Sequence, residues 1–277
     1  HKLSKYEGSP AGYCRQGRNQ AGRHPYSHRW RQGKIPFIGS FAEFVSGRIY
    51  DQVRQEIAYG NTNVKIASSH AGITLGEDGA THHGAFDLSY LRTVPGMTIM
   101  APLDEIELRA MMYSATSEEY AGPVAIRYPR GACEGYEMDW SAEPEPVARG
   151  RARMLRSGSG NVAVLSIGTI GNRVRKALDG LDAAHYDMRF LKPVDEEVLE
   201  DVSQKYDTVI TVEDGTVNGG LHSCVSQWMS GHGKHCAVVP LALPDRFVQQ
   251  GSVDELLSQS GLNIKEIENC VRKYSKK

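Results

Sequence analysis

Residues 64–100 read VKIASSHAGITLGEDGATHHGAFDLSYLRTVPGMTIM. Two short apolar runs, at 64–67 and 97–100, enclose a polar segment. Within it, residues 76–92 hold glycines, two adjacent histidines and three carboxylates. A strand, a polar loop and a second strand are typical of an open parallel sheet, where ligands bind beyond the carboxyl ends of the strands. A loop so rich in titratable groups adds little to a core, but it is well suited to binding a polar substrate and moving protons.

Short apolar strands continue to alternate with helices on both sides of this stretch. Further strands are predicted at 35–39, 123–126, 162–167, 187–190, 209–212 and 237–241. Predicted helices cover 48–59, the residues after 104, 172–181, the residues after 220 and two segments near the C-terminus. This order favours the α/β fold class with two doubly wound domains, each a parallel sheet covered by helices on both faces.

The predicted domains are residues 34–131 and 161–277, joined by a linker at 132–160 that is rich in proline, glycine and acidic residues. Residues 1–33 differ from the rest, because they carry several arginines, almost no aliphatic residues and no hydrophobic period. We expect this atypical basic segment to be a disordered extension or a frame-shifted sequence. A basic arm that contacts phosphate is the alternative.

Composition excludes several classes of protein. The 277 residues carry a net charge of −1, which disfavours nucleic acid or an acidic membrane as a general partner. No apolar run reaches the length of a membrane span, and the first residues contain no apolar signal region, so we expect a cytoplasmic protein. Five scattered cysteines without a Cys-x-x-Cys pair indicate free thiols rather than a zinc site or a disulfide framework.

Candidate catalytic residues lie in the polar loop. Asp78 and His82 are four residues apart among flexible neighbours. Such a pair can hydrogen-bond to adjacent hydroxyls of a sugar-like substrate, and a histidine moves protons near neutral pH. His70, at the end of the preceding strand, adds a third histidine to the region. The alternative is a solvated loop whose histidines have no function.

Other candidate groups follow other predicted strands. Phe41 and Phe44 come just after the first strand, where one of them can stack on a flat heterocycle or simply pack into the core. Arg127 and Arg130 close the last strand of the first domain, where they can clamp a phosphate or occupy a surface turn. The run 213–220 contains Glu-Asp-Gly and Gly-Gly but no complete nucleotide-binding motif, so structural turns are the better interpretation.

Four segments together resemble one enzyme family, the 1-deoxy-D-xylulose-5-phosphate synthases of the transketolase-like thiamine-diphosphate superfamily. They are GEDGATHHGAFDLSYLR (76–92), RYPRG (127–131), DMRFLKP (187–193) and LPDRF (243–247). The motifs occur in the family's order, and the resemblance runs from about Gly33 to the C-terminus. Residues 41–76 look more like the C-terminal half of split transketolases, which belong to the same superfamily.

The resemblance implies a pyrimidine-binding domain at residues 34–131 and a transketolase C-terminal-type domain at residues 161–277. The implied activity is that of a transferase which joins pyruvate to glyceraldehyde 3-phosphate with loss of carbon dioxide, in isoprenoid, thiamine and pyridoxal precursor synthesis. The implied cofactors are thiamine diphosphate and Mg²⁺. In the family the metal is held, through a Gly-Asp-Gly motif, by a separate diphosphate-binding domain. A homodimer is also implied.

The resemblance also assigns roles to residues of this chain. Phe44 matches the aromatic residue that stacks on the aminopyrimidine ring, and Phe41 matches a tyrosine lining the same pocket. Asp78 and His82 match the pair that contacts substrate and assists proton transfer. The two remaining matches concern phosphate binding. Arg130 corresponds to a phosphate-binding arginine of the synthases. His70 stands at the position of a second phosphate-binding arginine in the synthases.

Two departures from the family pattern bear on activity. The 277 residues contain no Gly-Asp-Gly, so they hold no recognisable metal site. The position expected for the family's catalytic glutamate falls, by counting, at Asn19, and an amide cannot exchange that proton as a carboxylate does. We therefore expect a fragment of the synthase that is inactive alone. The alternatives are the C-terminal subunit of a split transketolase and a non-catalytic binding or scaffold subunit with the same fold.

Overall fold

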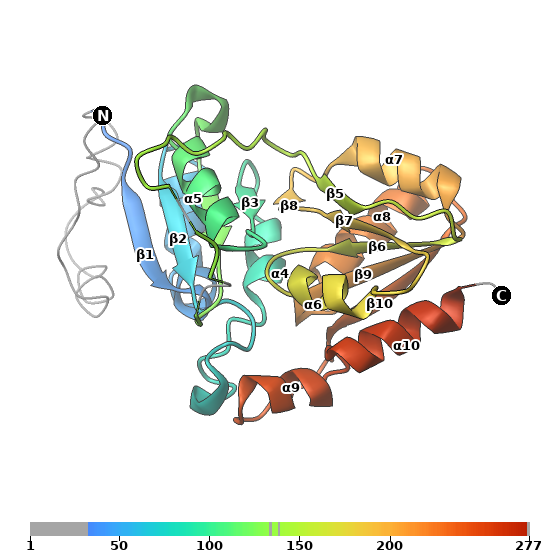
Figure 1. Ribbon diagram of the computed structural model, residues 1–277. Coiled ribbons are helices and arrows are strands. Elements are labelled where there is room, and N and C mark those ends of the chain that lie inside the picture. Colours follow the sequence, from blue (N-terminus) through green and yellow to red (C-terminus); the bar gives the residue numbers. More distant parts are fainter. Residues whose placement is uncertain (1–32, 133–134, 138, 276–277) are drawn as a thin grey trace.

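The computed structural model describes residues 33–132, 135–137 and 139–275. Its strands form two five-stranded sheets with helices against their faces, and the sheet of the N-terminal half also takes one strand from the C-terminal half (Figure 1). This arrangement confirms the predicted α/β fold class. Apart from Gly33, the segment 1–33 lies outside the described residues.

The first sheet has the strand order β1-β2-β4-β3-β8. Its strands are β1 (Phe37–Phe41), β2 (Lys65–Ser69), β4 (Val124–Arg127), β3 (Thr98–Met100) and β8 (Phe190–Lys192). The first four are mutually parallel, whereas β8 runs antiparallel to β3. Because parallel strands end at the same edge, the residues that follow β1, β2 and β4 are brought together there.

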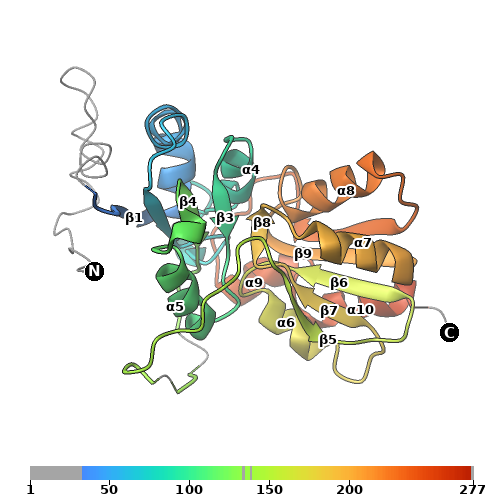
Figure 2. The same ribbon diagram turned by 90° about the horizontal axis from the view of Figure 1, so that it is seen from above.

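Helices cover both faces of this sheet (Figure 2). On one face lie η1 (Phe44–Arg48), α3 (Tyr50–Gln52), η2 (Val53–Ala58) and α4 (Asp87–Arg92), and on the other lies α5 (Glu105–Ser114). The predicted helix at 48–59 is confirmed, with Val53 and Ile57 buried, although its turns are mostly of the wider π type. Two single turns, η3 (Gly76–Asp78) and η4 (Glu118–Tyr120), lie in the connections.

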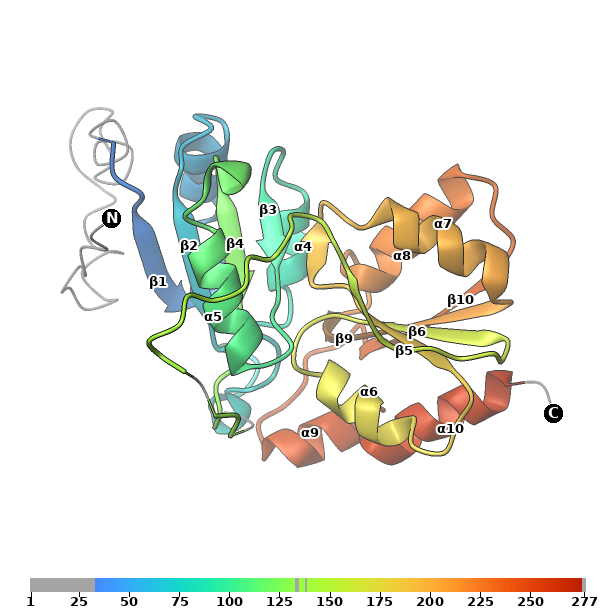
Figure 3. The same ribbon diagram turned by 45° about the horizontal axis from the view of Figure 1, so that its top comes forward.

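The second sheet has the order β10-β9-β6-β7-β5. Its strands are β10 (Ala237–Leu243), β9 (Thr208–Thr216), β6 (Val162–Ser166), β7 (Ala184–Asp187) and β5 (Arg153–Arg156). Helices α7 (Glu196–Lys205) and α8 (Leu221–Gly231) cover one face, and α6 (Gly171–Ala177) and α10 (Ile264–Tyr274) cover the other (Figure 3). Helix α9 (Val253–Gln259) packs against η3 of the first half. Strand β5 lies inside the segment expected to be a linker and pairs antiparallel with β7.

One predicted strand is wrong, because residues 187–190 belong to two different sheets. Strand β7 ends at Asp187 in the second sheet, and β8 begins at Phe190 in the first. Between them the chain turns through Arg189, whose φ of +55° is unusual for a residue with a side chain. Residues 187–190, which look like one continuous strand in the sequence, therefore cross from the second sheet to the first.

The interpretation of residues 213–215 as turns is also wrong. These residues continue strand β9, which runs to Thr216 and is buried along its whole length. The carboxylate of Glu213 stays in the interior because it accepts hydrogen bonds from the backbone N–H groups of Leu221 and His222, each at 2.8 Å. These N–H groups lie in the first turn of α8 and have no partner within that helix. The buried acidic side chain thus caps a helix.

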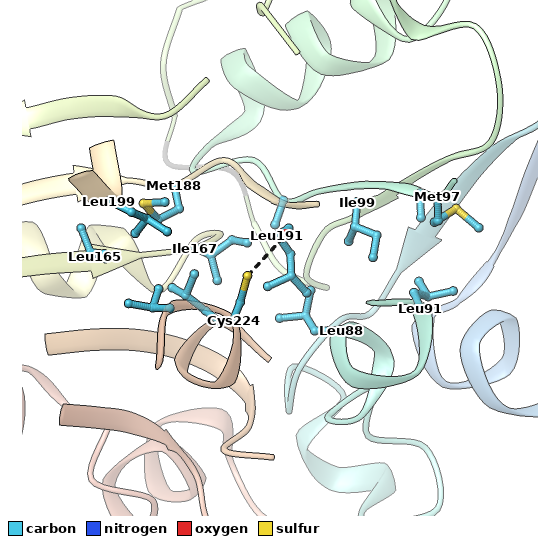
Figure 4. Packing of buried hydrophobic residues seen from close by; sticks show 14 of the residues in the cluster. Leu88, Leu91, Met97, Ile99, Leu165, Ile167, Met188, Leu191, Leu199 and Cys224 are labelled. Carbon is cyan, nitrogen blue, oxygen red and sulfur yellow. Dashed lines mark hydrogen bonds between the residues drawn. The ribbon is translucent and has the colours of Figure 1, made fainter. Parts of the chain in front are cut away.

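The two halves share one hydrophobic core. A single cluster runs from Ile99 of β3 and Leu88 of α4 to Leu165 of β6 and Leu199 of α7 (Figure 4). Leu191 of β8 lies at its centre, where its carbonyl oxygen is 3.8 Å from the Sγ of Cys224 (Figure 4). Two further clusters fill the opposite faces of the two sheets. The two sheets are therefore packed through a continuous apolar interior.

The structure also bears on two expectations from the sequence, that no segment spans a membrane and that the cysteines are free thiols. Within the described part of the chain, every helix is too short or too polar to cross a lipid bilayer. The cysteines in that part are free thiols, as predicted, and they are Cys224, Cys236 and Cys270.

Candidate active site at the carboxyl edge of the first sheet

Strand pairing brings the first two candidate side chains together. Phe41 at the end of β1 is in register with Ser69 at the end of β2, so His70 follows directly beside Phe41. The imidazole and phenyl rings are 4.0 Å apart between centroids, with 33° between their planes. The last residue of β1 and the residue after β2 thus form one partly buried ring pair at the carboxyl edge of the sheet.

Phe44 extends this ring pair. Its ring is 5.5 Å from that of Phe41 between centroids and almost parallel to it, at 15°. The edge-on ring of His82 lies 5.7 Å from Phe44, at 68°. The guanidinium carbon of Arg48 lies 4.1 Å from the centroid of the Phe44 ring. Four of the six site residues predicted from the sequence therefore meet in one cluster: Phe41, Phe44, His70 and His82.

A close backbone approach holds the loop that carries His82 against the sheet. Gly84 bridges to Ala71 and Gly72, and a Cβ at Gly84 would lie 2.7 Å from the Cβ of Ala42. A larger residue at position 84 therefore forces the loop away from the start of η1. The hydroxyl of Thr81 lies 2.9 Å from Nδ1 of His82, which fixes the orientation of the imidazole.

His70 lies in an environment that favours its neutral form. Partial burial lowers the pKa of His70, the positive charge of Arg130 lowers it further, and Asp78 opposes both. Its Nδ1 is 2.9 Å from the hydroxyl of Ser69, and its φ of +58° holds the backbone in the left-handed region. Arg130 and Asp78 therefore act on the same imidazole, although both side chains are exposed.

The turn that carries Arg130 is attached to the polar loop. The backbone N–H of Arg130 donates to the hydroxyl of Thr74 at 3.0 Å, and that hydroxyl donates to the carbonyl of Ala71 at 2.8 Å. The turn after β4 thus lies beside the residues that follow β2. All six predicted site residues come from segments at the carboxyl edge of the first sheet.

Arg127 does not form a phosphate clamp with Arg130. Its side chain is only 3% exposed and lies between two carboxylates. Its Nε donates to Asp87 at 2.7 Å, and its Nη1 donates to Asp214 at 2.6 Å. The two-arginine interpretation of 127–131 is therefore wrong for Arg127, since its charge is already neutralised inside the protein.

The two adjacent histidines of the loop have different surroundings. His82 is partly exposed, whereas His83 is only 2% exposed, and burial lowers the pKa of His83. The Nε2 of His83 lies 3.4 Å from the carbonyl oxygen of Gly76, across the base of the loop. The sequence gives no signal for this difference, because neighbouring loop residues have no fixed periodicity.

Comparisons with known proteins agree with this geometry. Residues 29–134 match the family model of the transketolase pyrimidine-binding domain, and residues 150–267 match that of the transketolase C-terminal domain. The chain is 30% identical to the solved structure of a split gene transketolase in an inactive β4 tetramer. That match has a TM-score of 0.76 and covers 90% of this chain and 78% of that one. The chain belongs to the transketolase family.

Within this family the chain resembles curated synthases. It is 44% identical over 238 residues to the 1-deoxy-D-xylulose-5-phosphate synthase of Porphyromonas gingivalis, a match covering 84% of this chain and 37% of that protein. It is 41% identical over 248 residues to the enzyme of the same name from Parabacteroides distasonis, covering 88% of this chain and 38% of that protein. The chain thus spans a little over a third of the length of these curated relatives.

The ring cluster fits one part of the cofactor that a transketolase-family fold implies. The aminopyrimidine of thiamine diphosphate is flat, and Phe44 presents a ring face that already holds a flat cation, the exposed guanidinium of Arg48. Among the residues that the structure describes, no group of His, Cys, Asp and Glu side chains is arranged to hold a metal ion. Asn19, the expected position of the catalytic glutamate, lies outside them.

Sequence reasoning missed the buried charged residues around this site. Asp87 and Asp214 hold Arg127, and Glu213 caps α8, yet their carboxylates are far apart in sequence. For Glu213 and Asp214 the available signal is a pair of acidic residues at the end of an apolar strand, since a buried charge rarely lies in such a position without a partner.

Proposed function

We propose that this chain provides the pyrimidine-binding side of a thiamine-diphosphate-dependent transferase of the 1-deoxy-D-xylulose-5-phosphate synthase type. Its reaction condenses pyruvate with glyceraldehyde 3-phosphate and releases carbon dioxide. The observation that carries the proposal is the cluster of Phe41, Phe44, His70 and His82 at the carboxyl edge of the first sheet. The identity of about 40% to the curated synthases supports the choice of reaction.

Phe44 and Phe41 are the residues proposed to hold the cofactor ring. When bound, thiamine diphosphate supplies a carbanion and an electron sink for breaking and making carbon–carbon bonds. The near-parallel rings of Phe41 and Phe44 provide a flat apolar surface on which an aminopyrimidine can stack. Arg48 is exposed, so it can leave the face of Phe44 when the cofactor ring arrives.

His82 and Asp78 are the proposed catalytic residues. The contact between Nδ1 of His82 and Thr81 leaves Nε2 as the atom that can hold or release a proton toward substrate. Asp78 lies on the exposed turn η3, and its charge acts on His70 and His83. We assign Asp78 to binding substrate hydroxyls and to proton transfer together with His82.

Arg130 and His70 are the proposed phosphate-binding residues. Arg130 is exposed at the end of the β4 turn, and a guanidinium binds phosphate through paired N–H groups. His70 lies close enough to Arg130 that the arginine charge lowers the pKa of its imidazole. A bound phosphate dianion reverses this effect, because it favours the protonated imidazole. The pair thus becomes a stronger anion site once substrate arrives.

A second domain is required for this reaction. We propose that a diphosphate-binding domain or subunit supplies the Mg²⁺ site and closes the pocket over Phe44, and that the working enzyme is a homodimer. The family's catalytic glutamate has no counterpart in the residues that align with it by counting. We therefore propose that the 277-residue chain alone is inactive.

Carbon dioxide release tests the proposal. The chain is mixed with a diphosphate-binding domain from a curated synthase, thiamine diphosphate, Mg²⁺, radiolabelled pyruvate and glyceraldehyde 3-phosphate. We expect no turnover from the chain alone and no more than weak turnover in the mixture, since Asn19 replaces the glutamate by count. Restoring the family's glutamate turn at 18–20 is expected to raise the rate. Turnover at an ordinary enzymatic rate by the chain alone contradicts the proposal.

A split transketolase is the second candidate. The match to the split gene transketolase, which covers 78% of that chain, favours it. Such an enzyme takes ketose phosphates as donors and releases no carbon dioxide. Parallel assays with xylulose 5-phosphate and with pyruvate therefore distinguish the two functions. Tight thiamine-diphosphate binding without turnover of either donor, after the glutamate is restored, points instead to a non-catalytic subunit.

A further inference from the structure

Arg127 joins the two domains directly beneath the polar loop. It projects from β4 of the first sheet and binds Asp87 at the start of α4 and Asp214 on β9 of the second sheet. All three side chains are nearly or completely buried, with 3%, 0% and 9% exposed for Arg127, Asp87 and Asp214. Breaking such a buried pair leaves an uncompensated charge in the interior, so its geometry is strongly held.

Asp214 also touches the backbone at one end of the loop. A Cβ at Gly72 would lie 2.3 Å from Oδ2 of Asp214, and Gly72 has a φ of +66°. The carboxylate thus packs against the main chain two residues after His70. Only glycine allows both this approach and this backbone conformation without strain.

Strand β9, which carries Asp214, also holds the other end of the segment between His70 and Ala85. The backbone N–H of Thr216 donates to the carbonyl of Ala85 at 2.8 Å. Ala85 follows Gly84, which bridges to Ala71 and Gly72. Residues 214–216 of the second domain therefore contact both ends of the segment between His70 and Ala85, which includes His82.

We propose that the Arg127–Asp214 pair is a positioning device, through which the C-terminal domain sets the placement of His70 and His82. Arg127 and Asp214 touch neither substrate nor cofactor in this role. They act by fixing Gly72 and Ala85, and thereby the loop that lies between. The inference deepens the proposed function, on which it rests for the roles of the two histidines.

A second buried network provides the comparison. On the other side of the domain boundary, Nε of Arg189 lies 2.7 Å from Oε1 of Glu107, and both side chains are largely buried. This pair also joins the two domains, since Glu107 belongs to α5 on the first sheet and Arg189 follows β7 of the second sheet. It contacts neither end of the loop. Loss of either pair weakens the domain contact, but only the Arg127–Asp214 pair is expected to move the histidines.

The test uses the full chain with ¹⁵N-labelled histidine, followed by NMR across a pH titration. In Asp214→Asn we expect the pH midpoint of the His70 titration to rise and the ring signals of His82 to shift. The reason is that the segment between His70 and Ala85 is then no longer held by Asp214, which exposes the imidazole of His70 to water. Electrostatics alone predicts the opposite change at His70. Without the carboxylate of Asp214, the positive charge of Arg127 is no longer balanced, and a nearby imidazole is then harder to protonate.

Two further variants complete the test. Gly72→Ala keeps every charge but displaces Asp214 by steric contact, and it is expected to raise the His70 midpoint as Asp214→Asn does. Arg189→Gln is the control, expected to lower the melting temperature while leaving both histidines unchanged. The inference is overturned if folded Asp214→Asn and Gly72→Ala show wild-type histidine titrations, or if Arg189→Gln shifts them equally. Because these readouts need no cofactor or turnover, they are independent of whether the proposed reaction is correct.

Discussion

The imidazole of His70 lies 4.0 Å from the ring of Phe41, between centroids, because Phe41 ends β1 and His70 directly follows the neighbouring strand β2. This contact buries part of the imidazole, and burial is the largest cause of the lowered pKa of His70. The second cause is the positive charge of Arg130. Burial therefore favours the neutral form of this histidine most, and a residue that the resemblance assigns to phosphate favours it further.

Arg130→Gln is expected to raise the pKa of His70, because it removes a positive charge that opposes protonation. NMR titration of the histidine ring measures the change in the full chain. Arg48→Gln is the matched control, since it removes a similar exposed charge that contacts Phe44 instead. An unchanged His70 titration in Arg130→Gln contradicts the proposed coupling.

Phe44→Ala is expected to weaken thiamine-diphosphate binding by about tenfold, since an aromatic stacking contact contributes about 1 kcal/mol and its apolar area adds to this. Calorimetric titration of the chain assembled with a diphosphate-binding domain provides the measurement. Phe247→Ala is the control, because Phe247 is 68% exposed and lies outside the ring cluster. Equal losses in the two variants count against a specific role of Phe44.

Glu213→Ala is expected to lower the free energy of unfolding by about 1–2 kcal/mol, because two N–H groups in the first turn of α8 lose their acceptor. Urea denaturation measures the loss. Asp254→Ala removes an acidic residue that is 82% exposed and pairs with Arg173 on the surface. Its expected effect is below about 0.5 kcal/mol, and a comparable loss there argues against the capping role.

His185 is expected to make the protein less stable in acid. Burial lowers its pKa from 6.5 to about 3, and its Nε2 is 2.8 Å from the hydroxyl of Ser166. The unfolded chain therefore takes up the proton first as pH falls. Stability from this group is complete above pH 6.5 and is lost progressively between pH 6.5 and about pH 3.

Urea denaturation at several pH values checks this dependence. In His185→Gln the slope of unfolding free energy against pH is expected to flatten, by up to about 1.4 kcal/mol per pH unit. His235→Gln, at an exposed histidine, is expected to keep the wild-type slope. If both variants retain it, the acid sensitivity arises elsewhere.

Leu191→Ala is expected to cost about 3 kcal/mol, because Leu191 is 1% exposed at the centre of the shared core. Amide hydrogen exchange distinguishes how the loss is distributed. We expect the slow amides of β2 and β6 to lose protection together, since one cluster spans both sheets. Loss confined to one sheet indicates that the domains unfold independently.

The sequence predicts most of this fold because its strands are short apolar runs of a consistent type. The runs at 162–167 and 209–212 became β6 and β9, and the helix at 48–59 kept Val53 and Ile57 on its buried side. The crossing at 187–190 was missed because Arg189, which turns the chain between the sheets, interrupts no apolar pattern. The spacing of apolar residues along the chain indicates which side chains are buried, but it does not indicate which sheet a strand joins.

The sequence predicted the members of the candidate site, and the resemblance gave their roles, but neither gave the contacts between them. Spacing alone placed Asp78 and His82 in one loop, but the proximity of Phe41, Phe44 and His70 depends on the pairing of β1 with β2. The partners of Arg127 could not be found from sequence, because Asp214 is 87 residues away and lies in the other domain. Long-range ion pairs leave no periodic trace along a chain.

Strand β8 has a consequence for the engineering of chimaeras. A graft made at the 132–160 connection separates β8 from β3, the strand with which it pairs in the first sheet. The transplanted half would then bring a foreign edge strand into the recipient's sheet. Compatible exchange between relatives requires residues 190–192 to match the host on the β3 side, so recombination at the apparent boundary is constrained by three residues far downstream of it.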